Sequence, residues 1–251
     1  MLARTGECSR SQARAAIAAG RVRLNGRIVR DPDAWVDPVR DRIELDGAPV
    51  RARKKEVWML HKPVGFVTTA NDEHGRDTVY ALLPKDLPWL APVGRLDQDT
   101  SGLLLFTNDS DLADAITRPT SKLPKTYEAV CKGRLGDDAI VRLAGGVELD
   151  DGPTLPARVE RTGGDERTTL LRLVLVEGRN RQVRRMLMAV GSRVLALHRE
   201  RIGPLVLGDL ACGAARRLGT AELSALRAAV AAKVSRAPPH RRGRTSPDRA
   251  R

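Results

Sequence analysis

The chain has 251 residues, 41% of them hydrophobic, which is enough for one sizeable core and a small second domain. Its formal net charge is +13, and this excess indicates a polyanionic partner, either a nucleic acid or an anionic membrane surface. No apolar run is long enough to span a bilayer, and the N-terminus has no signal-peptide pattern. We therefore expect a cytoplasmic protein that does not act at a membrane.

The cysteines and histidines give no sign of a metal site or a disulfide framework. The three cysteines, Cys8, Cys131 and Cys212, are odd in number and far apart in the sequence. The four histidines also lack the spacing of metal ligands. We therefore expect no bound metal ion.

The N-terminal segment, 1–49, has the pattern of a helix followed by a β-hairpin. Ser9 and Gln12 form a capping box at the start of a helix predicted over 10–19. Two short alternating segments then flank an Asn-Gly pair, which is a typical two-residue hairpin turn. These elements would present five arginines, Arg10, Arg14, Arg21, Arg23 and Arg27. The pattern alone leaves open whether they bind RNA or form a solvated basic face.

A basic linker, 50–56, separates this segment from a main domain predicted over 57–235. The main domain begins with strands predicted over 57–60 and 64–69. The segment 82–92 contains three prolines, and we expect an irregular connection there, packed on the core.

The polar stretch 94–102 organises the middle of the chain. It precedes four large apolar residues, 103–106, which predict a short strand buried on both faces. A carboxylate just before such a strand is held rigidly and still reaches a substrate. Asp97 is the candidate, as a nucleophile, a general base or an ion-pair partner of Arg95. An isolated acid in a loop more often only shapes a turn.

The remaining segments complete a mixed set of helices and strands. The predicted elements are a helix capped by Asp109 or Ser110, strands over 126–130, 168–176 and 194–197, and helices over 179–190 and 220–234. The last segment, 236–251, has six arginines and one aspartate and is expected to be a disordered basic tail. The rest of the chain still carries +8 (13 minus 5), so the basic character does not come from the tail alone.

Four motifs in this order resemble those of the pseudouridine synthases. The stretch 94–102 contains Gly-Arg-Leu-Asp followed by Thr-Ser-Gly and resembles the active-site motif. Residues 61–65 resemble the Lys-Pro-x-Gly opening of the same catalytic domain, Lys-Thr-Tyr at 125–127 its tyrosine motif, and 178–186 its arginine motif. The resemblance covers roughly 60 to 235. The Arg-Arg-Met ending of the fourth motif is similar to the subfamily that modifies bacterial ribosomal RNA.

The resemblance implies an α+β fold with two parts. Residues 1–49 resemble the small RNA-binding module of ribosomal small-subunit protein four, with its first helix truncated. The catalytic domain is then expected to be a mixed, largely antiparallel sheet with the cleft across it. Its implied activity is isomerisation of a specific uridine to pseudouridine in ribosomal RNA, with the large-subunit RNA favoured over the small-subunit RNA. We expect a monomer that acts on the RNA or on an assembling subunit; the alternative is a non-catalytic ribosome-assembly factor.

The resemblance assigns the nucleophile to Asp97, which would attack C6 of the uracil ring or form an adduct at C1′ of the ribose. The sequence does not choose between these routes. The reaction breaks the N1–C1′ bond and joins C5 to C1′. No redox step or group donor is needed, so we expect no cofactor.

Two further residues are expected in the catalytic cleft. Tyr127 is a candidate to stack on an extruded base, and the family's tyrosine is also proposed to help remove the C5 proton. Arg184 falls beside the apolar stripe of a helical wheel that starts at 179, and it aligns with the family's ion-pairing arginine. We expect it to pair with Asp97 and keep that carboxylate ionised.

The other arginines of these motifs are expected to contact RNA. Arg181 and Arg185 fall on the far side of the same helical wheel and are candidates for phosphate contacts. Arg95 is expected to contact the RNA backbone or occupy the place vacated by the flipped nucleotide. Lys62 and Pro63 are expected to be structural.

Overall fold

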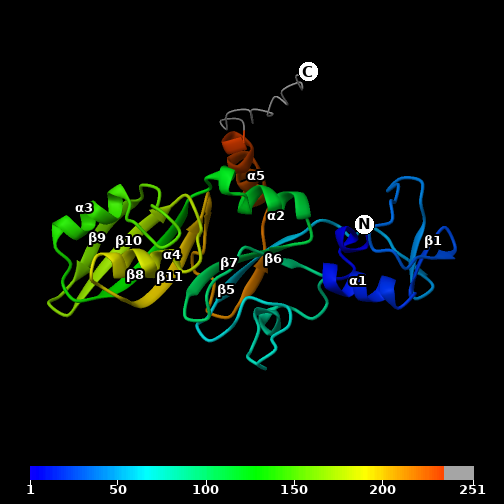
Figure 1. The fold of residues 1–251 in the computed structure, drawn as a ribbon, viewed down its shortest axis with the longest axis horizontal. Helices are drawn as coiled ribbons and strands as arrows, with labels where there is room; N and C mark the ends of the chain where they lie inside the picture. The colour runs from blue at the N-terminus through cyan, green and yellow to red at the C-terminus, as the bar shows by residue number, and fades with distance from the viewer. Residues whose placement is uncertain (235–251) are drawn as a thin grey trace, which may run out of the picture.

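The computed structural model describes residues 1–234 and shows a small N-terminal module beside a larger domain built on one extended sheet (Figure 1). The expected basic tail, 236–251, lies outside the described residues. In the part of the chain that is described, no helix combines the length and the apolar character needed to cross a bilayer.

The N-terminal module consists of a short 3-10 helix, one α-helix and two hairpins. Its elements are η1 (Leu2–Thr5), α1 (Arg10–Ala18), β1 (Val22–Leu24), β2 (Arg27–Ile28), β3 (Ile43–Leu45) and β4 (Ala48–Pro49), with the strand order β2-β1-β3-β4. The predicted capping box is confirmed, because the Ser9 Oγ accepts a 3.1 Å hydrogen bond from the Gln12 N–H and the Ser9 N–H donates to Gln12 Oε1. The predicted Asn-Gly hairpin is confirmed by positive φ angles at Asn25 and Gly26.

The larger domain contains a mixed, largely antiparallel sheet, which confirms the expected α+β class. Its strands are β5 (Val57–Lys62), β6 (Ala91–Val93), β7 (Ser101–Thr107), β8 (Lys125–Lys132), β9 (Arg158–Gly164), β10 (Thr168–Leu175), β11 (Val194–Ile202), β12 (Leu205–Val206) and β13 (Ala215–Arg217). The main order is β13-β5-β7-β11-β8-β10-β9, with β6 on β7 and β12 on β11. Among these strands, β7 and β11 run parallel and the other pairs are antiparallel.

Helices cover the two halves of this sheet. They are η2 (Val79–Leu82), α2 (Ser110–Thr117), η3 (Pro119–Ser121), α3 (Asp137–Gly145), α4 (Gln182–Ala189) and α5 (Thr220–Val234). Three predictions of secondary structure differ from the structure. The segment 82–92, expected to be irregular, contains the start of β6, because Ala91 and Pro92 pair with β7. The strand predicted over 64–69 is a loop with one isolated bridge from Val67 to Thr78, because the chain turns at Gly65 with φ +100°. The helix predicted from 179 begins only at Gln182.

Each half of the sheet has its own apolar core. In one half, Leu103 and Leu105 of β7 pack against Leu226 of α5. In the other, Leu143 of α3 and Met186 of α4 pack among the side chains of β8, β10 and β11. Figure 1 shows α3 and α4 on one half and α2 and α5 at the other.

The two halves join through the short parallel pairing of β7 and β11. Only two residue pairs form it, Ser101 with His198 and Gly102 with Arg199. Gly102 has φ +112°, and a Cβ at this position would lie 2.3 Å from the carbonyl oxygen of Arg199. A glycine is therefore required where the strands approach each other most closely. This contact places the loop 94–100 directly at the junction of the two halves.

Candidate active site

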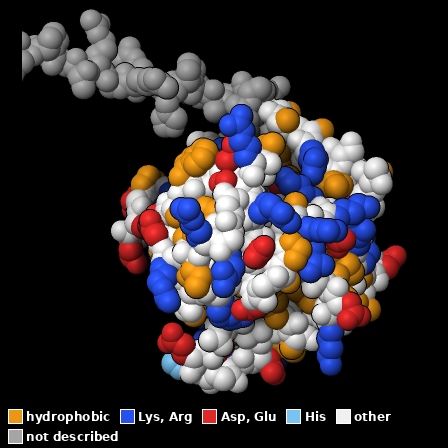
Figure 2. Space-filling view, turned by 90° about the vertical axis from the view of Figure 1, so that its right-hand side faces the viewer, with side chains coloured by type: hydrophobic (Ala, Val, Ile, Leu, Met, Phe, Trp, Pro, Cys, Tyr) orange, Lys and Arg blue, Asp and Glu red, His pale blue; other side chains and the backbone are white. Residues whose placement is uncertain are grey.

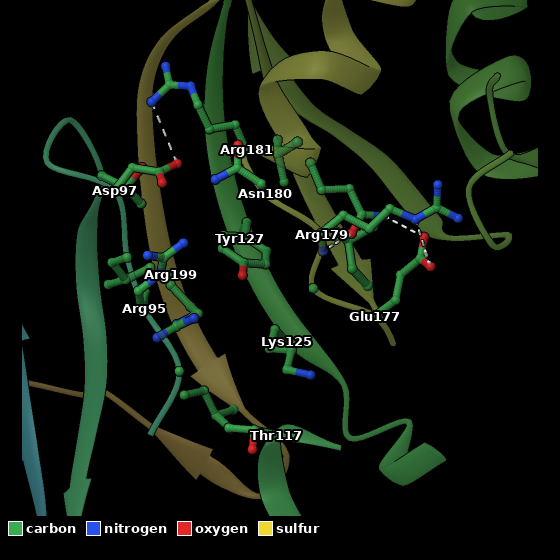
Figure 3. A pocket seen from close by; sticks show the side chains of 18 of the residues that line it. Arg95, Asp97, Thr117, Lys125, Tyr127, Glu177, Arg179, Asn180, Arg181 and Arg199 are labelled. Atoms are coloured by element: carbon green, nitrogen blue, oxygen red, sulfur yellow. Dashed lines mark hydrogen bonds and ion pairs between the residues drawn. The ribbon is translucent and has the colours of Figure 1, made fainter. Parts of the chain in front are cut away.

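A cavity of about 530 Å³ opens at the junction of the two halves. It is lined by the loop before β7, by β8 and β11, and by the segment that leads into α4. Asp97, Tyr127, Arg95 and Arg181 all line it, so the structure brings four of the predicted site residues together (Figure 3). They come from three sequence motifs that are far apart in the chain.

The loop that carries Asp97 is anchored by a buried lysine. Lys62, at the end of β5, is fully buried, and its Nζ donates hydrogen bonds to the carbonyl oxygens of Pro63 at 2.9 Å, Asp97 at 3.1 Å and Thr100 at 2.8 Å. Burial lowers the pKa of Lys62 to about 8, although the negative charges of Asp99 and Asp97 oppose this shift. The motif lysine thus holds the backbone at Asp97 and at Thr100, three residues later.

The Asp97 carboxylate faces the cavity and remains partly exposed. About a third of its side chain is accessible, at 31%, and its Oδ2 lies 3.7 Å from Nη1 of Arg181. Figure 3 shows this pair spanning from the loop to the segment before α4. The carboxylate is therefore fixed in space and still open to a substrate.

The arginine beside Asp97 is Arg181, not Arg184 as the helical wheel predicted. The wheel assumed a helix from 179, but α4 begins at Gln182 and Arg181 has a left-handed backbone with φ 48°. Its guanidinium therefore turns toward the loop and also binds Asp99, at 3.0 and 3.2 Å. The expectation that Arg181 lies on the far side of the helix was wrong.

Arg184 instead binds the loop next to Asp97. Its side chain is only 12% exposed, and its Nη2 donates to the Asp99 carbonyl oxygen at 2.8 Å and lies 3.2 Å from the Asp99 carboxylate. A longer contact of 3.4 Å reaches Thr100 Oγ1. Burial would raise the pKa of Asp99, but the hydrogen bond from Arg181 and the charges of both arginines hold it below its ordinary value. The two arginines and Asp99 thus clamp the loop against α4.

Arg185 is engaged away from the cavity. Its guanidinium binds both carboxylate oxygens of Asp151, at 2.8 and 3.1 Å, and its Nε donates to the carbonyl oxygen of Asn180. A guanidinium paired in this way is less available to a phosphate than a free one. The structure therefore gives Arg185 an architectural contact in place of the expected exposed position.

Four basic residues of the cavity were missed as site residues from the sequence: Arg118, Lys125, Arg179 and Arg199. Lys125 lies two residues before Tyr127 on β8, so strand alternation puts both side chains on the same face. Burial lowers the pKa of Lys125 to about 8, and the nearby charges of Arg199 and Lys122 add to this shift. Lys125 belongs to the tyrosine motif. The alternation of side chains along a strand, which puts residues 125 and 127 on one face, was the signal that could have identified it.

Arg199 was also missed, and it is the most deeply placed of these cations in the sheet. It lies on β11, beyond the end of the strand predicted over 194–197, and it is 5% exposed. Its Nε donates a 2.8 Å hydrogen bond to the carbonyl oxygen of Leu103. Alternation from the buried Leu197 would have placed it on the buried face.

The cavity is rich in positive charge. Arg95, Lys125, Arg181 and Arg199 line it together with the acids Asp97 and Glu177, and Glu177 is itself paired with Arg179. Such a surface attracts a polyanion. Among residues 1–234, no group of three or more His, Cys, Asp or Glu side chains lies close enough together to hold a metal ion.

The arginines predicted for RNA binding in the N-terminal module are all exposed. They are Arg10, Arg14, Arg21, Arg23 and Arg27. Arg21 forms an ion pair with Asp46, whereas Arg10, Arg14 and Arg27 form none with any described residue. Figure 2, which faces this module, shows Lys and Arg side chains over much of the surface and fewer acidic ones between them.

Comparison with known proteins agrees with this geometry. Residues 56–189 match the family model described as RNA pseudouridylate synthase, and residues 1–39 match the S4 domain. The chain is 40% identical over 234 residues to an uncharacterized RNA pseudouridine synthase of Aquifex aeolicus, covering 92% of this chain and 94% of the relative. It is 38% identical to the ribosomal large subunit pseudouridine synthase B of Bacillus subtilis, covering 91% and 94%.

A solved structure gives the same result. The crystal structure of a pseudouridylate synthase aligns with a TM-score of 0.65 and 33% identity, covering 87% of this chain and 94% of that one. These matches favour an enzyme over the alternative of a non-catalytic assembly factor. The chain therefore belongs to the RNA pseudouridylate synthase family, the enzymes that isomerise uridine to pseudouridine in RNA.

Proposed function

We propose that this enzyme modifies a uridine of bacterial large-subunit ribosomal RNA and that Asp97 is its nucleophile. The observation that carries the proposal is the position of Asp97, whose carboxylate faces a cationic cavity with Tyr127 on its wall. The name of the Bacillus subtilis relative supports the choice of the large subunit. The exposed arginines of the S4 domain supply a surface that suits an RNA backbone.

The proposed chemistry uses the Asp97 carboxylate in one of two ways. It attacks C6 of the uracil ring or C1′ of the ribose, the N1–C1′ bond breaks, C5 is joined to C1′, and the bond from Asp97 to the substrate breaks to release the carboxylate. The C5 proton leaves and a proton is restored at N1, so atoms and charge balance without a co-reactant. Within residues 1–234 the Tyr127 hydroxyl makes no hydrogen bond, which leaves it free to contact the substrate.

The proposed roles of the arginines follow their contacts. Arg184 is a positioning residue, because it binds the backbone and side chain of Asp99 and does not touch Asp97 within ion-pair distance. Arg181 lies close enough to neutralise part of the Asp97 charge. Arg95 is exposed at the opening of the cavity and is placed to contact the RNA backbone. One chain supplies both the S4 domain and the cavity, so we propose that a monomer is active.

The substrate is tested by mapping pseudouridine in ribosomal RNA from cells with and without this gene. The proposal predicts that one site or a small group of neighbouring sites in the large-subunit RNA loses pseudouridine and regains it when the intact gene is returned. Loss confined to the small-subunit RNA would contradict the choice of subunit. An unchanged map of both RNAs would contradict ribosomal RNA as the substrate.

A further inference from the structure

Arg199 carries a hydrogen-bond donor that no described residue satisfies. Its side chain is 95% buried (5% exposed), its Nε is bound to the Leu103 carbonyl oxygen, and its Nη2 is buried without a partner. An unsatisfied charged donor in a protein interior is costly, and such groups are rare in native structures. Arg199 also lines the active-site cavity, so a small rotation of its guanidinium would bring this donor to an acceptor on a bound substrate.

The position of Arg199 is rigid. Its backbone packs on Gly102, the glycine that ends the Asp97 motif, so the guanidinium is tied to the same junction as the catalytic loop. On the other side, Arg199 pairs directly with Tyr127 across the β8 and β11 strands. Side chains of directly paired residues point to the same face of a sheet. A base stacked on Tyr127 would thus have one edge beside the guanidinium.

The depth of Arg199 separates it from the other cations of the site. Arg95 and Arg181 line the cavity but are exposed, so they are accessible to the phosphates of an RNA backbone. A phosphate stays with its chain, whereas an extruded base enters the pocket. A guanidinium only donates hydrogen bonds, and uracil offers two acceptors on its edges, the carbonyl oxygens O2 and O4.

We propose that Arg199 is a base-recognising residue whose Nη2 donates a hydrogen bond to a carbonyl oxygen of the uracil extruded into the cavity. The inference rests on the proposed function, because it takes the target base to lie over Asp97 and against Tyr127. If the acceptor is O4, the same contact disfavours cytosine, which carries an amino group at that position.

The test uses the intact enzyme and three RNA transcripts that differ only at the target position found by mapping: uridine, 2-thiouridine or 4-thiouridine. Sulfur is a weaker acceptor than oxygen, so one of the two thio substrates removes the contact. The rate of pseudouridine formation at saturating enzyme is compared for the wild type, Arg199→Met and the control Arg201→Met. Arg201 lies on the same strand, is exposed and does not line the cavity.

We expect Arg199→Met to slow the reaction on uridine by about 10- to 100-fold while RNA affinity changes by less than about twofold, because a buried charged hydrogen bond is lost. One thio substrate slows the wild type and Arg201→Met, and this slowing disappears in Arg199→Met. If thermal unfolding shows that Arg199→Met is not folded, Arg199→Lys allows the same comparison. Lysine keeps the positive charge but lacks the planar set of guanidinium donors.

Two outcomes would overturn the inference. Equal thio effects in the wild type and the Arg199 variant would mean that Arg199 only supports β7 through Leu103. A large loss of RNA affinity with a shallower salt dependence, at unchanged rate, would mean that it binds a phosphate. A wild-type enzyme that forms no pseudouridine in the uridine transcript would instead contradict the proposed function, whatever the variant does.

Discussion

Two regions of this enzyme are rich in arginine, and their guanidinium groups meet different partners. Around the start of α4, Arg181 and Arg184 bind Asp99, and Arg185 binds Asp151. In the N-terminal module, Arg10, Arg14 and Arg27 are exposed and, within residues 1–234, form no ion pair. The first group holds loops in place, and the second is left to the solvent.

The difference shows what positive charge does in each region. Arg181 and Arg184 fix the loop that carries Asp97, so removing either one should change the rate of the chemical step. The free arginines have no structural partner to lose, so removing one should change only the attraction for RNA. The comparison can be tested by measuring turnover and affinity separately for variants of both regions.

We expect the largest loss of stability and activity from a substitution at Gly102, where the catalytic loop meets β11. Gly102→Ala would place a Cβ 2.3 Å from the Arg199 carbonyl oxygen at a backbone with φ +112°. We expect the free energy of unfolding to fall by roughly 2–5 kcal/mol and activity to be lost with it. Chemical denaturation measures the first and pseudouridine formation the second.

Gly133→Ala is the matched control for this variant. Gly133 also has a positive φ, +79°, but a Cβ added at this position would meet no neighbouring atom within 4 Å. It should lose only about 1 kcal/mol from backbone strain and keep its activity. Equal losses in the two variants would show that the contact between β7 and β11 is unimportant.

A smaller effect is expected at Arg184. Arg184→Lys keeps the charge but loses the planar fork that reaches the carbonyl oxygen and the carboxylate of Asp99. We expect turnover at saturating RNA to fall by about 10- to 100-fold, which corresponds to about 1.5–3 kcal/mol for a charged hydrogen bond. RNA affinity should change little. Near-normal turnover would show that Arg184 does not position the loop.

We expect Lys125 to make RNA affinity moderately dependent on pH. Its pKa in the folded protein is about 8, well below the ordinary value, so the side chain is charged below pH 8 and becomes neutral as the pH rises through that value. The cavity then loses positive charge, and RNA affinity should fall by a few fold between about pH 7 and 9. Affinity titrations across this range measure the effect.

Lys125→Arg is the variant that assigns this pH dependence. An arginine stays charged over the whole range, so the part of the decline that belongs to position 125 should disappear. The pKa of the buried Lys62 is also about 8. Any decline in RNA affinity that remains in Lys125→Arg therefore comes from Lys62 or from another group. An identical decline in both proteins would exclude Lys125 as its source.

The smallest effect is expected in the N-terminal module. Arg14→Gln should weaken RNA binding by about 3- to 10-fold, reduce the slope of log affinity against log salt by about 1, and leave turnover at saturating RNA unchanged. Arg21→Gln should weaken binding less, because Asp46 already compensates the charge of Arg21. A drop in turnover at saturating RNA in Arg14→Gln would contradict the inference that the arginines of the N-terminal module affect only RNA affinity.

Much of the fold could be predicted from local patterns. The capping box at Ser9 and the Asn-Gly turn are contained in a few adjacent residues, and both appear in the structure. The hairpin of β3 and β4 was missed, although an Asp-Gly pair at its turn, with positive φ at Asp46 and Gly47, was a usable signal. Helix α3 and strand β9 were also missed.

The candidate site could be predicted only in part. Asp97 and Tyr127 belong to contiguous motifs, and both line the cavity. The partner of Asp97 was misassigned because it depends on a single backbone angle, the left-handed φ of Arg181, which starts α4 one turn late. A non-glycine residue in that region is stabilised by tertiary contacts, and no local propensity indicates it.

The role of Asp97 as the nucleophile is tested most directly by the activity of Asp97→Asn. Tritium release from RNA labelled at C5 of uridine measures the reaction, and thermal unfolding verifies the fold. We expect the variant to fold and bind RNA as the wild type does but to release no tritium above background. Release at a rate near that of the wild type would contradict Asp97 as the nucleophile.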